Sequence, residues 1–203
     1  DGYVSRISVS PWGYGNGLYL THPDGTTTVY GHLQRFAPSI ARYIKTQQYE
    51  QESFNVNLFL DPDQLPVKKG EIVAYSGNTG SSGGPHLHFE VRDTESEEVL
   101  DPIEYFKEKI TDTRAPKIQG ILVCPQSGKG VVNGSSRKLE LKPVTAKNGK
   151  QTITGKIEAW GEIGLAVKAY DYMDNTTNIY GVKDITLRQD SQIIYHSNLD
   201  RFA

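Results

Sequence analysis

Two histidines, His86 and His88, stand two residues apart in the segment Gly-Gly-Pro-His-Leu-His-Phe-Glu at residues 83–90. The alternation at Phe89–Val91 predicts a strand, and positions i and i+2 of a strand share one face. The two imidazoles then lie about 7 Å apart, which is two strand rises. On that spacing alone, a metal site and a chance pair on a polar sheet are equally compatible. Glu90 is expected on the same face, either orienting an imidazole or as a solvated strand residue.

A glycine-rich loop precedes these histidines and favours a functional site. Residues 77–85 contain four glycines, but they lack the Gly-Lys-Ser/Thr ending of a phosphate loop and lead into a strand rather than a helix. We expect the glycines to allow the close backbone approach of an extended ligand.

The elements that position these residues are predicted to be mainly β. Residues 1–35 have the pattern of an antiparallel meander, with a tight turn at Pro23-Asp24-Gly25. Residues 36–66 break that pattern with a helical spacing after Pro38 and a short alternating strand. This segment is either an insertion or lid that contributes to binding, or a plain surface excursion. Residues 67–92 return to the sheet, with strands at 72–76 and 86–91.

The second half of the chain is predicted to form a separate domain. A short helix at 101–107 precedes a polar linker with a proline at 111–116, which is typical of a domain boundary. Short strand-like runs separated by turn signals then favour a small immunoglobulin-like β-sandwich over 113–203, which we expect to be incomplete. The runs are 118–123, 138–141, 153–157, 164–170, 180–189 and 193–196.

Composition excludes several classes of function. The 203 residues suit one large or two small domains, and 36% hydrophobic content is enough for a core. A net charge of −2 gives no electrostatic case for nucleic acid. No apolar run reaches the roughly 18 residues of a membrane span. The single Cys124 cannot form an internal disulfide and is expected to be a buried strand residue rather than a nucleophile.

Five motifs follow one another along the first 90 residues. They are Gly-Tyr-Gly-Asn at 13–16, Thr-Val-Tyr-Gly-His-Leu at 28–33, Val-Lys-Lys-Gly at 67–70, Ser-Gly-Asn-Thr-Gly at 76–80 and Gly-Pro-His-Leu-His-Phe-Glu at 84–90. Together they resemble the lysostaphin-type (LytM-like) zinc metallopeptidases, which cut peptide cross-links in bacterial peptidoglycan. The resemblance covers roughly residues 1–106, so we expect a peptidase domain over 1–110 with an insertion at 36–66.

The resemblance implies a compact antiparallel β-sheet crossed by a groove, and it implies roles for three histidines. His88 would be a zinc ligand, while His32 and His86 would act on the water and the transition state. Zinc with three protein ligands and an open position suits hydrolysis. The substrate would be the stem peptides or cross-bridges of peptidoglycan, and the protein would work in the periplasm or cell envelope.

The sequence departs from the family at one point. The other two zinc ligands come from an upstream His-x-x-x-Asp, and none lies before Gly13. One imidazole alone holds zinc poorly. His22 is expected to be structural, His196 to be a surface strand residue, and Asp171 and Asp174 to have no metal role.

Three interpretations remain open. In the first, the sequence is a piece of a longer zinc endopeptidase whose missing pair precedes Asp1; the strand-like alternation at Asp1–Ile7 and the presence of all three histidines favour it. In the second, the protein is a non-catalytic scaffold that binds and activates another cell-wall hydrolase. In the third, the C-terminal domain has the main role, as a spacer or as a module that binds an envelope protein.

Overall fold

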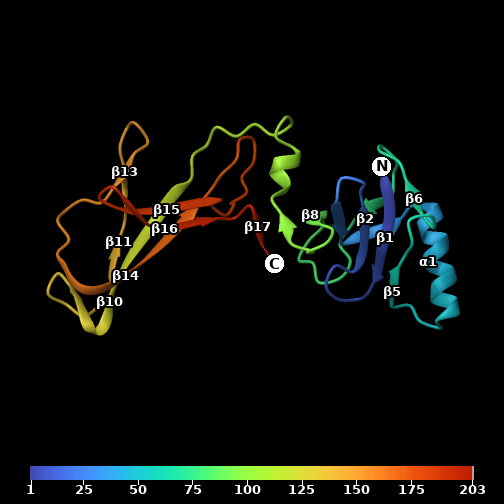
Figure 1. Ribbon diagram of the computed structural model, residues 1–203, viewed down its shortest axis with the longest axis horizontal. Helices are drawn as coiled ribbons and strands as arrows, with labels where there is room; N and C mark the ends of the chain where they lie inside the picture. Colours follow the sequence, from blue (N-terminus) through green and yellow to red (C-terminus); the bar gives the residue numbers. More distant parts are fainter. Residues whose placement is uncertain (203) are drawn as a thin grey trace. The chain divides into compact units, whose positions relative to one another are not determined.

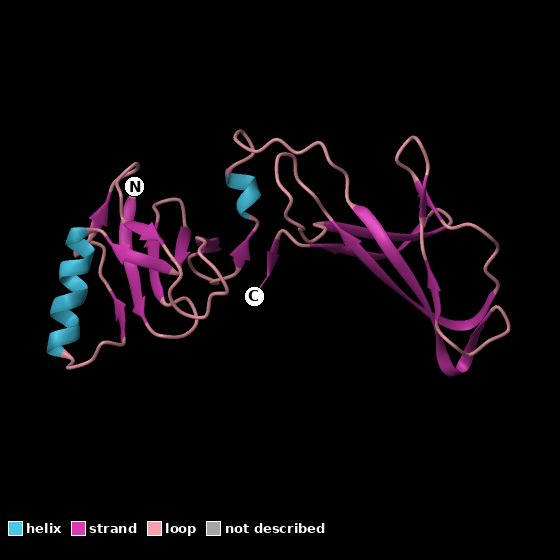
Figure 2. Ribbon diagram, turned by 180° about the vertical axis from the view of Figure 1, so that it is seen from behind, coloured by secondary structure: helices cyan, strands magenta, loops and turns pink. Residues whose placement is uncertain are grey.

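The computed structural model describes residues 1–202 and divides into two compact units. The N-terminal unit comprises residues 1–105 together with the last strand from Asp200 on, and the C-terminal unit comprises Phe106–Leu199. Strands dominate both units (Figure 2), so the predicted mainly β, antiparallel architecture is confirmed. Among the residues described, no helix has the length and apolar character needed to cross a membrane.

One antiparallel sheet organises the N-terminal unit (Figure 1). Its path runs β17-β9-β8-β3-β2-β1-β5, with β6 also pairing with β1. The strands are β1 (Gly2–Val9), β2 (Asn16–Thr21), β3 (Thr26–Gly31), β5 (Val56–Phe59), β6 (Pro66–Val67), β8 (His88–Asp93), β9 (Val99–Leu100) and β17 (Arg201–Phe202). A second, two-stranded sheet pairs β4 (Leu33–Phe36) with β7 (Ala74–Ser76), and a 3-10 helix covers Pro102–Tyr105.

The core lies on one face of this sheet. Ile7 pairs with Leu18 across β1 and β2, and both side chains are fully buried. Helix α1 (Pro38–Glu50) adds Ile40 and Ile44 to the same cluster. Burying such aliphatic side chains stabilises the fold by about 1.5–3 kcal/mol each.

The segment 36–66 is part of the core and of the sheet, so it is not a plain surface excursion. Pro38 occupies the first turn of α1, where its missing N–H costs no hydrogen bond. The helix packs on the core, and β5 then pairs with β1 at residues 56–59. The segment completes the sheet and its core because its apolar positions match the core face.

His88 and Glu90 lie at the start of β8 on the opposite face of the sheet. Gly31 pairs with His88, and two rows further Val29 pairs with Glu90. Because alternate residues of a strand point to the same side, His88 and Glu90 share this face, on which Val29 and Glu90 are buried. The ring of Tyr14 lies over Gly31: a Cβ there would come within 3.2 Å of Tyr14 Cδ1 and 3.1 Å of His88 Cβ.

The C-terminal unit consists of long hairpins. A three-stranded sheet β11-β10-β14 joins β10 (Lys117–Val132), β11 (Leu139–Leu141) and β14 (Ala159–Tyr170). Two-stranded sheets pair β12 (Val144–Thr145) with β13 (Gln151–Thr152) and β15 (Asp184–Gln189) with β16 (Gln192–Asn198). The predicted strand at 153–157 is wrong, since these residues form no strand. Cys124 lies on β10 and is half-buried. The immunoglobulin-like sandwich stays a prediction.

Candidate catalytic and metal site

Three predicted site residues converge beside the start of β8. His32, His86 and His88 each offer a ring nitrogen, and these nitrogens all lie within 4.8 Å of one another. The ring centroids of His32 and His86 are 4.7 Å apart, and those of His32 and His88 are 5.8 Å apart. Within the described part of the chain, this is the group of histidine, cysteine and acidic side chains that can hold a metal.

His32 is buried and held in an unusual backbone conformation. It follows β3 with φ of +58°, a region that non-glycine residues rarely adopt and that clusters at functional sites. Its N–H donates to Tyr14 O at 2.7 Å. Its Nδ1 lies 2.8 Å from Thr79 O, and because a carbonyl oxygen only accepts, Nδ1 carries the proton. Nε2 of His32 is therefore left as an acceptor.

His86 lies just before the strand rather than in it, which corrects the predicted strand over 86–91. β8 begins at His88, and His86 instead forms an isolated bridge with Gly77. Its N–H donates to Gly77 O at 3.0 Å, and its Nδ1 lies 2.8 Å from Gly84 O. The second carbonyl fixes the proton on Nδ1, so Nε2 is again an acceptor.

Residues of the other motifs tie together the loops that carry these histidines. The Asn16 side chain donates to Leu33 O at 2.9 Å, and the Thr79 hydroxyl donates to the same oxygen at 2.9 Å. The backbone N–H of Asn16 in turn donates to Thr79 Oγ at 3.0 Å. This network explains why the Gly-Tyr-Gly-Asn and Ser-Gly-Asn-Thr-Gly motifs accompany the histidines.

The loop glycines have a different role from the one that the sequence predicts. A Cβ at Gly77 would lie 2.5 Å from Gln34 N and 2.7 Å from Gln34 Cα. Gly77 thus allows close approach of the chain's own backbone, which places the loop that anchors His86. A Cβ at Gly83 or Gly84 would meet nothing within 4 Å, and a ligand-facing role for those two stays a prediction.

His88 contacts a buried carboxylate. Its Nε2 lies 2.5 Å from Glu90 Oε1, which also accepts from the Tyr14 hydroxyl at 2.5 Å. Arg92 donates through Nε and Nη2 to Glu90 Oε2, each at 2.6 Å. Burial opposes ionisation of Glu90, but the bonds from Tyr14, His88 and Arg92 outweigh it and lower the pKa of the carboxyl. Burial, followed by the bond to Glu90, raises the pKa of Tyr14 to about 12.

Tyr14 and Arg92 were not predicted from the sequence. Tyr14 stands in the Gly-Tyr-Gly-Asn motif, and Arg92 is two positions beyond Glu90 on the same strand face. The i, i+2 spacing of a glutamate and an arginine on one strand face is the sequence signal that could have identified the pair.

The remaining candidates lie outside the histidine cluster. His22 bonds Asp1 O at 2.9 Å and Thr28 Oγ1 at 2.8 Å, a structural role. His196 is an exposed residue of β16 whose Nε2 lies 3.2 Å from Asp184. It stands four residues before Asp200, so a His-x-x-x-Asp spacing does occur late in the chain, but this imidazole is already paired within the C-terminal unit. Asp174 accepts from Thr113 at 2.9 Å and links the turn to the linker.

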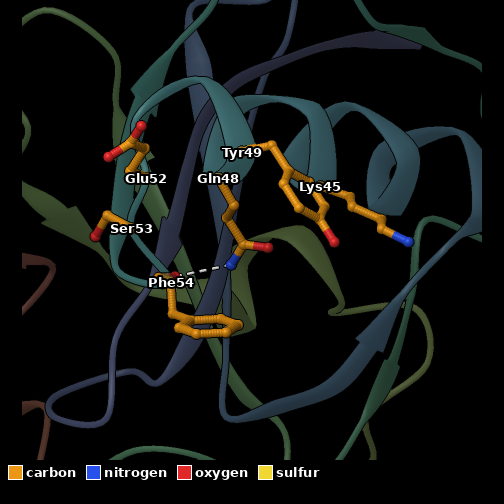
Figure 3. A pocket seen from close by; sticks show the side chains of 6 residues that line it. All are labelled: Lys45, Gln48, Tyr49, Glu52, Ser53 and Phe54. Atoms are coloured by element: carbon orange, nitrogen blue, oxygen red, sulfur yellow. Dashed lines mark hydrogen bonds between the residues drawn. The ribbon is translucent and has the colours of Figure 1, made fainter.

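An apolar surface pocket lies away from this chemistry, at the end of α1 (Figure 3). It is lined by Lys45, Gln48, Tyr49, Glu52, Ser53 and Phe54. Gln48 Nε2 donates to Phe54 O at 2.7 Å and closes one side. The histidines are not among its lining residues, so the position of the chemistry, rather than the pocket, defines the candidate site.

The donor set suits zinc. Imidazole nitrogens are common zinc ligands, and a bound histidine typically donates its other ring nitrogen to an oxygen acceptor. All three rings have such an acceptor: Thr79 O, Gly84 O and Glu90.

Comparisons with known proteins agree with this site. Residues 53–102 match Peptidase family M23. The chain is 32% identical over 80 residues to the DD-carboxypeptidase/endopeptidase Mpg of Neisseria meningitidis, covering 39% of this chain and 13% of that protein. It is 36% identical over 90 residues to an uncharacterized metalloprotease of Haemophilus influenzae, covering 44% and 14%. It is 32% identical over 90 residues to the peptidoglycan DD-endopeptidase ShyC of Vibrio cholerae, covering 44% and 15%.

The match thus spans about one-seventh of the length of these relatives. Among solved structures, the catalytic domain of lysostaphin from Staphylococcus simulans aligns with 26% identity and a TM-score of 0.35, over 52% of this chain and 65% of that one. The family match includes the His-x-His segment at residues 86–88. Residues 53–102 of the N-terminal unit are therefore similar to peptidase family M23, in agreement with the lysostaphin-type peptidases that the motifs resemble.

Proposed function

We propose that the protein containing this chain is a zinc-dependent endopeptidase that cleaves the peptide cross-links of bacterial peptidoglycan. The observation that carries the proposal is the convergence of His32, His86 and His88 within 4.8 Å in a domain similar to peptidase family M23. The printed activities of the relatives, a DD-carboxypeptidase/endopeptidase and a peptidoglycan DD-endopeptidase, support the substrate.

The roles divide according to what each imidazole touches. His88, with its Nε2 on Glu90, would hold the zinc together with ligands from outside this cluster. Bound zinc would activate a water and polarise the scissile carbonyl. Nε2 of His32 and of His86 would accept a proton from the attacking water and return one to the leaving amine. Glu90 is not the base, because Tyr14, His88 and Arg92 already occupy its oxygens.

The setting of the protein follows from the substrate. Peptidoglycan lies outside the cytoplasm, so we place the protein in the periplasm or cell envelope. The peptidase domain would extend over residues 1–110. An immunoglobulin-like domain over 113–203 would serve as a spacer or contact an envelope protein.

The test uses the complete natural protein, loaded with zinc and incubated with purified peptidoglycan. We expect new amino groups to appear, and we expect His86→Ala to lower their rate of release by at least about 100-fold, the usual worth of a general acid–base group. His22→Ala is the matched control, since His22 bonds Asp1 and Thr28 outside the cluster. It should keep the wild-type rate.

One outcome would favour the scaffold instead. If the zinc-loaded protein releases no amino groups but accelerates a second cell-wall hydrolase, the enzyme proposal fails. The specific observation behind this alternative is that, of the zinc ligands expected from the family, the described cluster supplies only His88.

A further inference from the structure

We propose that Glu90, held by Tyr14 and Arg92, is a positioning residue that fixes the proton of His88 on Nε2 and so makes Nδ1 its metal-binding nitrogen. The inference rests on the proposed function only in naming zinc as the group that His88 binds. Its structural part concerns the imidazole and the carboxylate alone.

The first step is the direction of the hydrogen bond. An ionised carboxylate only accepts, and Glu90 is ionised because it pairs with the always-charged guanidinium of Arg92, which donates twice to its Oε2. The 2.5 Å contact with His88 Nε2 therefore requires a proton on that nitrogen. In a neutral imidazole the lone pair is then left on Nδ1.

The second step is the orientation of the carboxylate. Arg92 donates to Oε2 through two nitrogens at 2.6 Å each, while Tyr14 and His88 both donate to Oε1. Glu90 is 9% exposed, and leaving such a charge unpaired would be strongly unfavourable. The carboxylate cannot rotate toward a metal without giving up these bonds, so it acts through His88 rather than as a ligand.

The third step is the position of the Tyr14 ring. Its ring lies on the surface made by Gly31, and its centroid is 4.7 Å from that of His88. A side chain at residue 31 would displace this ring. The ring of Tyr14 thus contacts His88 from one side while its hydroxyl bonds Glu90, so one loop residue and two residues of β8, Glu90 and Arg92, fix the imidazole.

The experiment reads the tautomer of His88 by long-range nitrogen–proton NMR on the metal-free protein, at a pH where the imidazole is neutral. We expect the Nε2–H form in the wild type. Glu90→Gln replaces the acceptor with an amide that can also donate, so a mixture of tautomers should appear. Zinc affinity, measured by competition with a chelator, should fall by about 10–100-fold.

Glu98→Gln is the matched control. Glu98 also pairs with an arginine in the same unit, Arg201 at 3.2 Å, but it touches none of the histidines. It should leave both readouts at their wild-type values. A wild-type His88 in the Nδ1–H form would overturn the proposal, as would a Glu90→Gln variant with an unchanged tautomer and unchanged zinc affinity.

If Glu90→Gln does not fold, the tautomer of His88 measured in the wild-type protein still tests the proposal. It also separates this inference from the proposed function. A protein with Nε2–H at His88 that cleaves no peptidoglycan would refute the function and leave the positioning role. An active protein with Nδ1–H would do the reverse.

Discussion

The two units of this chain contain similar strands but differ sharply in packing. In the N-terminal unit Val4, Ile7, Leu18 and Val29 are completely buried. Among the described residues of the C-terminal unit, the buried hydrophobic side chains are Val123 and Val132, while Trp160, Leu165, Ile193 and Ile194 are half or more exposed. An alternating sequence can thus form strands without also forming a densely packed core.

This difference bears on where function can be located. A catalytic group must be held in a fixed geometry by packed neighbours. The histidine cluster sits on the sheet that has a dense core behind it, and its loops are fixed by the bonds at Leu33 and Thr79. The hairpins of the C-terminal unit offer no comparable support for a site.

The largest expected effect tests the contrast in packing directly. Leu18→Ala should lower the free energy of unfolding of the N-terminal unit by about 2–5 kcal/mol, the cost of a cavity in a close-packed core. Leu165→Ala, at a side chain 54% exposed, should cost the C-terminal unit less than about 1 kcal/mol. Hydrogen exchange followed by mass spectrometry measures each unit separately. Equal losses in both units would remove the contrast.

The sequence predicted the structure best where a residue pattern has a single structural meaning. Alternation in residues 1–35 predicts the meander that β1, β2 and β3 form. The ordered motifs identify His32, His86 and His88, which the fold brings together although 54 or more residues separate His32 from the other two. Periodicity alone would not have assigned these three histidines to one site. The family resemblance made that assignment.

Other features depended on contacts that no local pattern reveals. The role of residues 36–66 was left open because an amphipathic helix looks the same on a lid and on a core. Glu90 has partners on its own strand, His88 and Arg92, and a distant one, Tyr14. The pairing of β3 with β8 places Gly31 beside His88, and Tyr14 lies against both. In the C-terminal unit, the run 153–157 has strand-like residues but no partner strand.

A smaller effect is expected at the loop that carries His86. Gly77→Ala places a methyl group 2.5 Å from Gln34 N, so the loop must shift at a cost of about 1–3 kcal/mol. We expect a lower melting temperature of the N-terminal unit and a displaced His86 ring signal in NMR spectra.

Two alanine variants serve as controls for this loop. Gly83→Ala adds a methyl group in open space of the same loop, and Gly164→Ala meets only ordinary contacts with Cys124 on β10. Both should keep the wild-type melting temperature of their unit. A tolerated Gly77→Ala would show that the N-terminal loops are no more tightly packed than the hairpins of the C-terminal unit.

The smallest effect should be the same in both units. Asp24 in the β2–β3 turn and Asp184 on β15 each have a lowered carboxyl pKa, chiefly through hydrogen bonds from Thr26 and from Asn198, respectively. A carboxyl whose pKa is lowered by folding stabilises the protein above its unfolded pKa, and this contribution is lost as the pH falls through the folded value. NMR titration should give both midpoints below the usual aspartate range. The hydrogen bonds of these two exposed aspartates do not depend on a packed core. A lowered carboxyl pKa at Asp24 alone would therefore show that the two units differ at their surfaces as well as in their interiors.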